Sequence, residues 1–166
     1  MALIDKLQVK EKLYRKNVVD IPTCDMCMDG VIRDEQGRFC GGFAKYTYNC
    51  GSNVAELCAI REGLLVAEGL GIRKLEIESD SMYAIQVCRG EIQATWYLNA
   101  VQKVIKFFCE KFEVISFSHK YREANNVTDV LAKGASKKSL LGVWLSEPPR
   151  EICESLFNDL IGITYP

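Results

Sequence analysis

The spacing of apolar residues changes near residue 52, and this change limits the possible folds more than any other feature of the sequence. Before it, three short runs rich in β-branched and aromatic side chains predict strands. They are residues 13–19, 30–33 and 38–48. Gly37 suits the positive φ of a tight turn between the second run and the third, so the first part of the chain is expected to form antiparallel strands.

After this point the sequence predicts alternating helices and strands. Ser52 or Asn53 is a suitable N-cap, and apolar residues then recur at helical spacing over residues 54–69. The elements expected next are a strand over 74–78, helices over 82–88 and 95–109, a strand over 114–117 and a helix from Asn125 or Asn126 to Ala135. This order favours a mixed α/β fold, in which helices pack on the faces of a mixed sheet.

A chain of 166 residues is long enough for one domain with a substantial core. We expect this domain over residues 13–136, after a short lead-in over 1–12. Residues 137–166 are expected as a tail, in which 152–161 predict an amphipathic helix. Hydrophobic residues make up 48% and charged residues 26%, which excludes a disordered chain, and no apolar run is long enough to span a membrane.

Eight cysteines first suggest disulfides or a zinc site, and Cys24 and Cys27 have the spacing of half such a site. Cys40 and Cys50 lack the paired spacing that the other half requires, and several other cysteines lie in apolar periodic segments. No signal peptide opens the sequence. We therefore expect reduced thiols and an intracellular protein, with the nucleus and the cytoplasm equally compatible.

Three carboxylates lie where predicted elements begin or end. Glu56 is in the first turn of the helix over 54–69, Asp80 follows the strand over 74–78, and Asp129 lies early in the last predicted helix. Each has a structural explanation by itself, because an acid in the first turn stabilises the helix dipole and an aspartate can act as a cap. Their order, spacing and neighbouring residues, taken together, indicate a family more specifically than any one of them does.

The motifs around these carboxylates resemble those of the ribonuclease H family, in particular the plant-type domains associated with reverse transcriptases. The matching segments are Gly30-Val31-Ile32-Arg33-Asp34 with Gly37, Ala55-Glu56-Leu57, Glu78-Ser79-Asp80-Ser81, and Arg122-Glu123-Ala124-Asn125 with Asp129-Val130-Leu131-Ala132-Lys133. The resemblance covers residues 16–136. It implies a ribonuclease H-like fold with a five-stranded mixed sheet, made of three antiparallel strands followed by two parallel ones.

The resemblance also implies cleavage of the RNA strand of RNA–DNA hybrids with two Mg²⁺ or Mn²⁺ ions. Mg²⁺ prefers hard oxygen ligands, and a pair of ions can activate the attacking water and stabilise the leaving oxygen. Glu56, Asp80 and Asp129 are the implied metal ligands and catalytic residues. Cleavage of RNA alone would follow from recognition of the 2′-hydroxyl.

A fourth carboxylate is expected in the first strand, where members of the family carry Asp followed by Gly. Asp20, Asp25 and Asp29 are the candidates. Asp20 fits best as a catalytic and metal-binding residue, because it follows the run over 13–19 and leaves room for a hairpin before Gly30. Asp25 leaves too few residues for that hairpin, and Asp29 leaves none.

The residues after Asp20 depart from the family pattern, because Ile21 and Pro22 stand where Gly and small polar residues are usual. Glycine permits close approach of the backbone to metal and substrate. The departure supports an alternative function, in which the domain is catalytically degenerate and binds nucleic acid or a protein partner.

The resemblance implies further contacts with the hybrid substrate. His119, the only histidine, has the spacing of a loop histidine that assists proton transfer or product release in ribonucleases H. The implied nucleic-acid-binding residues are Asn53, Ser81, Lys120, Arg122 and Asn125. The net charge is −1, so a basic surface must be local; residues 103–138 hold eight Lys or Arg against four acids, a surplus of four. We expect a monomer.

Overall fold

The protein is represented by a computed structural model, which describes residues 5–15, 24–47, 51–120 and 126–161. For residues 5–15, 24–27, 126, 128, 129 and 136 the description covers the backbone alone. In the described part of the chain, no helix is both long enough and apolar enough to cross a membrane.

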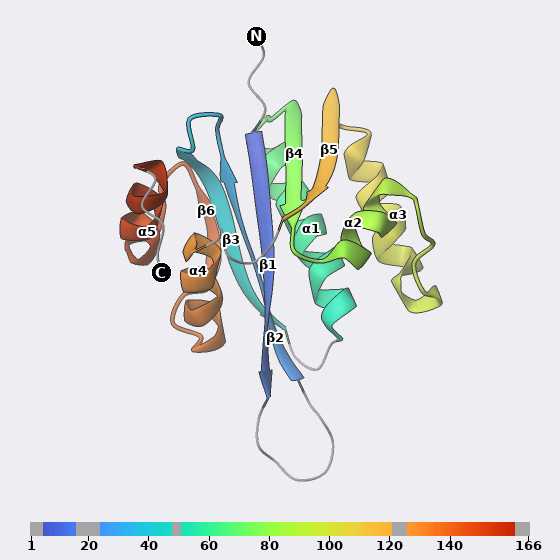
Figure 1. Cartoon of the computed structure of the whole chain (residues 1–166), viewed down its shortest axis with the longest axis horizontal. Coiled ribbons are helices and arrows are strands. Elements are labelled where there is room, and N and C mark those ends of the chain that lie inside the picture. The colour runs from blue at the N-terminus through green and yellow to red at the C-terminus, as the bar shows by residue number, and fades with distance from the viewer. Residues whose placement is uncertain (1–4, 16–23, 48–50, 121–125, 162–166) are drawn as a thin grey trace.

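One mixed sheet forms the centre of the molecule (Figure 1). Its six described strands lie in the order β5-β4-β1-β2-β3-β6. They are β1 (Asp5–Arg15), β2 (Cys24–Arg33), β3 (Phe39–Thr47), β4 (Lys74–Ser79), β5 (Val114–His119) and β6 (Gly142–Leu145). β1, β2 and β3 are antiparallel, and β4 and β5 run parallel to β1. This confirms the expected fold and adds β6, which pairs antiparallel with β3.

Helices cover both faces of this sheet. In Figure 1, α1, α2 and α3 lie on one side and α4 and α5 on the other. Their bounds are α1 (Ser52–Gly69), α2 (Met82–Arg89), α3 (Asn99–Cys109), α4 (Asn126–Ser136) and α5 (Arg150–Leu160), with a short 3₁₀ helix η1 (Trp96–Leu98) before α3. The amphipathic helix expected over 152–161 is α5.

Two hydrophobic cores result, one on each face. Ile32, Phe43 and Ile77 of the sheet pack with Leu57 and other residues of the first helical layer. On the other face Val31 and Ala44 pack with α4 and α5, through residues such as Val127, Leu131, Ile152 and Leu156. Val31 and Ile32 are adjacent in β2 and both are fully buried, as alternation of side chains requires in a strand covered on both faces.

The first strand lies earlier than the sequence predicted. β1 covers Asp5–Arg15, so it shares residues 13–15 with the expected strand over 13–19 and also includes residues that were expected as a lead-in. Residues 16–19 lie outside the described residues. The position follows from pairing on both sides, since β1 forms a parallel ladder with β4 and an antiparallel ladder with β2. β2 likewise begins at Cys24, six residues before the expected strand over 30–33.

Smaller differences concern the ends of the helices. The N-cap of α1 is Gly51, without a side-chain capping bond, so neither Ser52 nor Asn53 caps this helix as expected. The helix expected over 95–109 is divided into η1 and α3. The predicted tight turn is confirmed: Gly37 has φ +78°, and its N–H donates to the Asp34 carbonyl at 2.9 Å.

We predict that Gly134→Ala destabilises the fold. A Cβ at Gly134 in α4 would lie 2.6 Å from Leu140 Cβ and 3.0 Å from its Cδ2, and the Leu140 Cβ is held close to the backbone. Alanine favours a helix over glycine by about 1 kcal/mol. Overpacking of this kind costs about 1–3 kcal/mol, so a net loss is expected in the free energy of unfolding measured in urea.

Gly69→Ala is the matched control, because Gly69 also lies in a helix but a Cβ there meets no heavy atom within 4 Å. Its free energy of unfolding should stay unchanged or rise by up to about 1 kcal/mol. Equal stability of the two variants would contradict the close packing of α4 against Leu140.

Candidate functional site

Glu56 and Ser79 connect α1 to the end of β4. Glu56 lies near the start of α1 and is 3% exposed. The Ser79 hydroxyl donates a hydrogen bond to Glu56 Oε2 at 3.1 Å, and its oxygen accepts one from the Ser81 N–H at 3.1 Å. One serine therefore holds a buried carboxylate and the turn that carries Asp80. The sequence analysis did not assign a role to Ser79, although it lies next to Asp80.

Asp80 follows β4 directly and is partly exposed. Its turn continues into α2, whose N-cap is Ser81; the Ser81 hydroxyl oxygen accepts from the Ala84 N–H at 3.1 Å. The cap of this helix is therefore Ser81 and not Asp80. A strand end and a helix start meet at Asp80, so its backbone is fixed from both directions.

His119 lies beside this turn. It was expected in a loop but is the last residue of β5, where it pairs with Ser79 in the parallel ladder. The His119 Nε2 lies 3.2 Å from the backbone oxygen of Asp80, a distance at which a protonated Nε2 donates a hydrogen bond. The next N–H, of Lys120, donates to the Ser79 carbonyl at 3.0 Å. The strand is therefore two residues longer than its apolar pattern predicted.

Lys120 also forms an ion pair at this edge of the sheet. Its Nζ lies 3.6 Å from Oε1 of Glu78, whose side chain is only 5% exposed. Lys120 itself is largely exposed, so this pair lies at the border between the core and the surface. Glu78 was not among the predicted site residues, and its position in a short strand of alternating pattern gave no functional signal.

The other predicted residues are placed only in part. Asn53 is the second residue of α1 and is half-buried. Asp129 lies in the first turns of α4, where the backbone alone is described. Asp20, Arg122 and Asn125 lie outside the described residues. The described part of the first strand is β1, which ends at Arg15.

The middle of β1 is occupied by Lys10. In the parallel ladder Val9 pairs with Ser79, so the next residue along β1, Lys10, comes level with Asp80. In the antiparallel ladder Lys10 is the partner of Asp29 in β2. Asp29 is fully buried and also faces Ala44 of β3. A lysine and a buried aspartate are therefore direct neighbours at the centre of the sheet, beside the turn of Asp80.

Only part of the expected two-metal site lies among the side chains that the structure describes. Glu56 and Asp80 are carboxylates of the type that Mg²⁺ prefers. Lys10, whose backbone pairs in the strand beside them, is not a residue type that binds Mg²⁺. Among the residues that the structure describes, no group of three or more His, Cys, Asp or Glu side chains could hold a metal ion.

The described cysteines are also without a metal or a disulfide. Cys40, Cys58, Cys88, Cys109 and Cys153 are free thiols. Burial raises the pKa of Cys88 to about 12 and that of Cys109 to about 11, so both thiols stay protonated at neutral pH. Reduced cysteines that act as small hydrophobic residues were expected at these positions.

Comparison with known proteins shows which family shares these motifs. Residues 28–135 match the protein family described as "Reverse transcriptase-like"; the match does not include β1. A protein of Arabidopsis thaliana named "Putative ribonuclease H protein" is 31% identical over 137 residues, which are 82% of this chain and 22% of that protein. The chain thus spans about a fifth of the length of this relative.

Solved structures share the fold at low sequence identity. Ribonuclease H1 of the archaeon Halobacterium salinarum aligns with a TM-score of 0.70 and 18% identity over 81% of this chain and 98% of that one. The ribonuclease H1 called LC11, solved in complex with an RNA/DNA hybrid, gives 0.70 and 21% over 81% and 98%. The protease-reverse transcriptase of prototype foamy virus gives 0.61 and 14% over 84% of this chain and 21% of its own.

We predict that Ser79→Ala lowers the free energy of unfolding by about 1–3 kcal/mol, because buried Glu56 loses a hydrogen-bond donor. Urea denaturation at neutral pH measures the change. Ser116→Ala removes an exposed hydroxyl from the neighbouring strand β5 and should change stability by less than about 0.5 kcal/mol. A Ser79 variant as stable as the Ser116 variant would show that the bond to Glu56 is not formed.

Proposed function

This chain belongs to the reverse transcriptase-like family of ribonuclease H domains, and from that premise we propose that it binds RNA–DNA hybrids without cleaving them by two-metal catalysis. The residue in the middle of β1 carries this proposal. Members of the family have Asp followed by Gly in that strand, whereas β1 has Lys10 followed by Glu11. The ladder positions Lys10 level with Asp80.

A lysine at this position changes the electrostatics of the site in a definite way. In a two-metal site, divalent cations neutralise the carboxylates and attract the phosphate backbone. Lys10 is a cationic residue whose backbone is the ladder partner of Asp29. A lysine charge can offset part of the repulsion between acids and a phosphate, but it cannot generate a metal-bound nucleophile.

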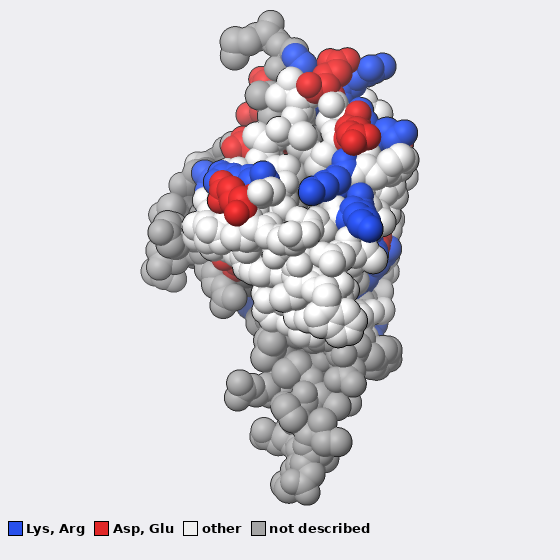
Figure 2. Space-filling model, turned by 90° about the vertical axis from the view of Figure 1, so that its right-hand side faces the viewer, with Lys and Arg blue, Asp and Glu red and all other residues white. Residues whose placement is uncertain are grey.

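The surface around the start of α2 adds contacts suited to a nucleic acid. Trp96 is 84% exposed and Tyr97 52%. The Thr95 N–H before them donates to the Tyr83 hydroxyl at 3.4 Å, which connects η1 to the start of α2, close to Asp80. Figure 2 shows the face formed by α2, α3 and β5, with charged side chains over one half and a broad uncharged area beside them. Exposed aromatic rings favour stacking with bases without sequence reading.

A metal-dependent ribonuclease is the second candidate, because Glu56, Ser79, Asp80 and His119 form a connected group at the end of β4. In this alternative Asp20 and Asp129 would complete the ligand set for two Mg²⁺ or Mn²⁺ ions, which would activate water for hydrolysis of the RNA strand. Lys10 argues against it, and the next experiment separates the two candidates.

We predict that the wild-type protein does not cleave a labelled RNA–DNA hybrid in Mg²⁺ or Mn²⁺, and that the double variant Lys10→Asp, Glu11→Gly gains cleavage. The substitutions replace the lysine by a carboxylate and introduce the small residue that the family has after it. The gained activity should disappear in EDTA and in a triple variant that also carries Asp80→Asn. A rise in melting temperature on addition of Mg²⁺, confined to the double variant, provides a measurement independent of cleavage. Metal-dependent cleavage by the wild type would overturn the proposal.

Binding is tested separately by fluorescence anisotropy with a labelled hybrid. The apparent Kd should rise steeply with salt, because contacts to phosphates release counterions. Trp96→Ala should weaken binding by about tenfold, since loss of one stacking contact costs about 1–3 kcal/mol. Val143→Ala, an exposed change on β6, is the control and should leave the Kd unchanged. If the protein shows no salt-dependent binding, the proposed function fails.

A further inference from the structure

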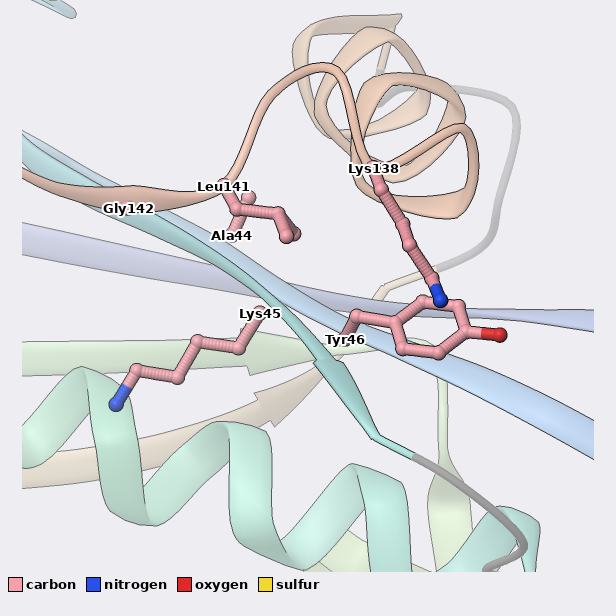
Figure 3. A pocket seen from close by; sticks show the side chains of 6 residues that line it. All are labelled: Ala44, Lys45, Tyr46, Lys138, Leu141 and Gly142. Carbon is pink, nitrogen blue, oxygen red and sulfur yellow. The ribbon is translucent and has the colours of Figure 1, made fainter.

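A cavity of about 450 Å³ opens where the chain passes from α4 to β6, beside the end of β3. Its lining residues are Ala44, Lys45, Tyr46, Lys138, Leu141 and Gly142 (Figure 3). The volume lies in the range of small-molecule sites. The cavity is on the face of the sheet that α4 covers, and the residues discussed for the candidate site do not line it.

Lys138 is held at this cavity by its backbone. It follows α4 with φ +56°, the left-handed conformation that glycine adopts most easily. Its N–H donates to the Ala135 carbonyl at 2.9 Å, and the next N–H, of Ser139, donates to the Gly134 carbonyl at 3.0 Å. A lysine in this conformation is uncommon, and such positions concentrate where a side chain has a task.

The ammonium group of Lys138 lies against an aromatic ring. Its Nζ is 4.5 Å from the centroid of Tyr46, a cation–π contact. Figure 3 shows the lysine side chain descending from the end of α4 onto this ring, with Leu141 and Ala44 facing them across the cavity. The cavity therefore combines a fixed positive charge, a flat ring and an apolar wall.

The charge around the cavity is positive on the side of α4. Lys133 and Lys137 are exposed near the end of this helix, and Lys138 is exposed directly after it. Lys45 does not add to this charge, because it pairs with Glu62 of α1. Figure 3 shows its side chain directed away from Tyr46. Of these lysines on the α4 side only Lys138 lines the cavity, so a ligand meets its ammonium group at one side and apolar surface at the other.

We propose that this cavity binds one nucleotide unit, with the base against the Tyr46 ring and Leu141 and the phosphate against the Lys138 ammonium. A planar base suits a slot between a ring and an aliphatic wall, and a phosphate suits a fixed ammonium group. An acidic peptide could satisfy the charge but offers no planar group to the Tyr46 ring, one face of which the Lys138 ammonium covers. The inference rests on the proposed function and deepens it, since it gives that nucleic-acid-binding domain a second contact, beyond the C-terminal end of the helix that carries Asp129.

Isothermal titration calorimetry with AMP, supported by NMR shifts of the Ala44 and Leu141 amides, tests this site in the full chain. Lys138→Gly removes the ammonium group and suits the left-handed backbone, so the fold should be retained with little change in melting temperature. AMP affinity should fall by about tenfold with the loss of one charge-assisted hydrogen bond. Lys137→Ala removes the same charge one residue earlier, outside the cavity lining, and should leave the affinity unchanged.

Variants of Tyr46 test the stacking surface. Tyr46→Phe keeps the ring and should bind AMP within about twofold of the wild type, whereas Tyr46→Leu should weaken binding about tenfold. Equal effects of Lys137→Ala and Lys138→Gly, or no AMP binding by the wild type, would overturn the proposal. Binding of a glutamate-rich peptide at this site, in place of AMP, would also overturn it.

The AMP experiment separates this inference from the proposed function. AMP needs only the cavity, so binding that depends on Lys138 supports the cavity even if the hybrid does not bind. Conversely, hybrid binding without an effect of Lys138 on AMP affinity leaves the proposed function intact and removes the cavity from it.

Discussion

The pairing of β1 with strands on both sides is the constraint on which the rest of the domain depends. β1 pairs parallel with β4 and antiparallel with β2, and so connects the hairpin half of the chain to the half in which helices and strands alternate. The ladder with β4 ends at Ser79. This residue also donates a hydrogen bond to Glu56 and pairs with His119 of β5. Whatever residue stands in the middle of β1 is therefore fixed beside the site by backbone hydrogen bonds.

The parts of the fold with a clear period could be predicted from the sequence, and β1 could not. The helical spacing of Leu57, Ile60 and Leu64 and the turn at Gly37 depend on neighbouring residues, and both are confirmed. A central strand buried on both faces usually has a nearly continuous apolar run. Residues 5–15 instead alternate aliphatic with charged or polar residues, so only their long-range pairing identifies the strand.

The residues of the candidate site also differ in whether they could be predicted from the sequence. Glu56 and Asp80 could be found from short motifs, because the residues around them belong to the same helix start or strand end. Lys10 could not be found, since its place beside Asp80 depends on a ladder between segments about 70 residues apart. The role of Ser79 could not be predicted either, because it is a hydrogen bond between β4 and α1. Function in this family therefore has to be judged strand by strand.

The two hydrophobic cores on opposite faces of the sheet have a consequence for motion. Val31 and Ile32 are neighbouring residues of β2, and their side chains belong to different layers. Such a division favours two cooperative units, with α4, α5 and β6 in the smaller one. Amide hydrogens of α4 should then exchange through local opening, ahead of those of α1, and each opening would move Asp129 and Lys138 together.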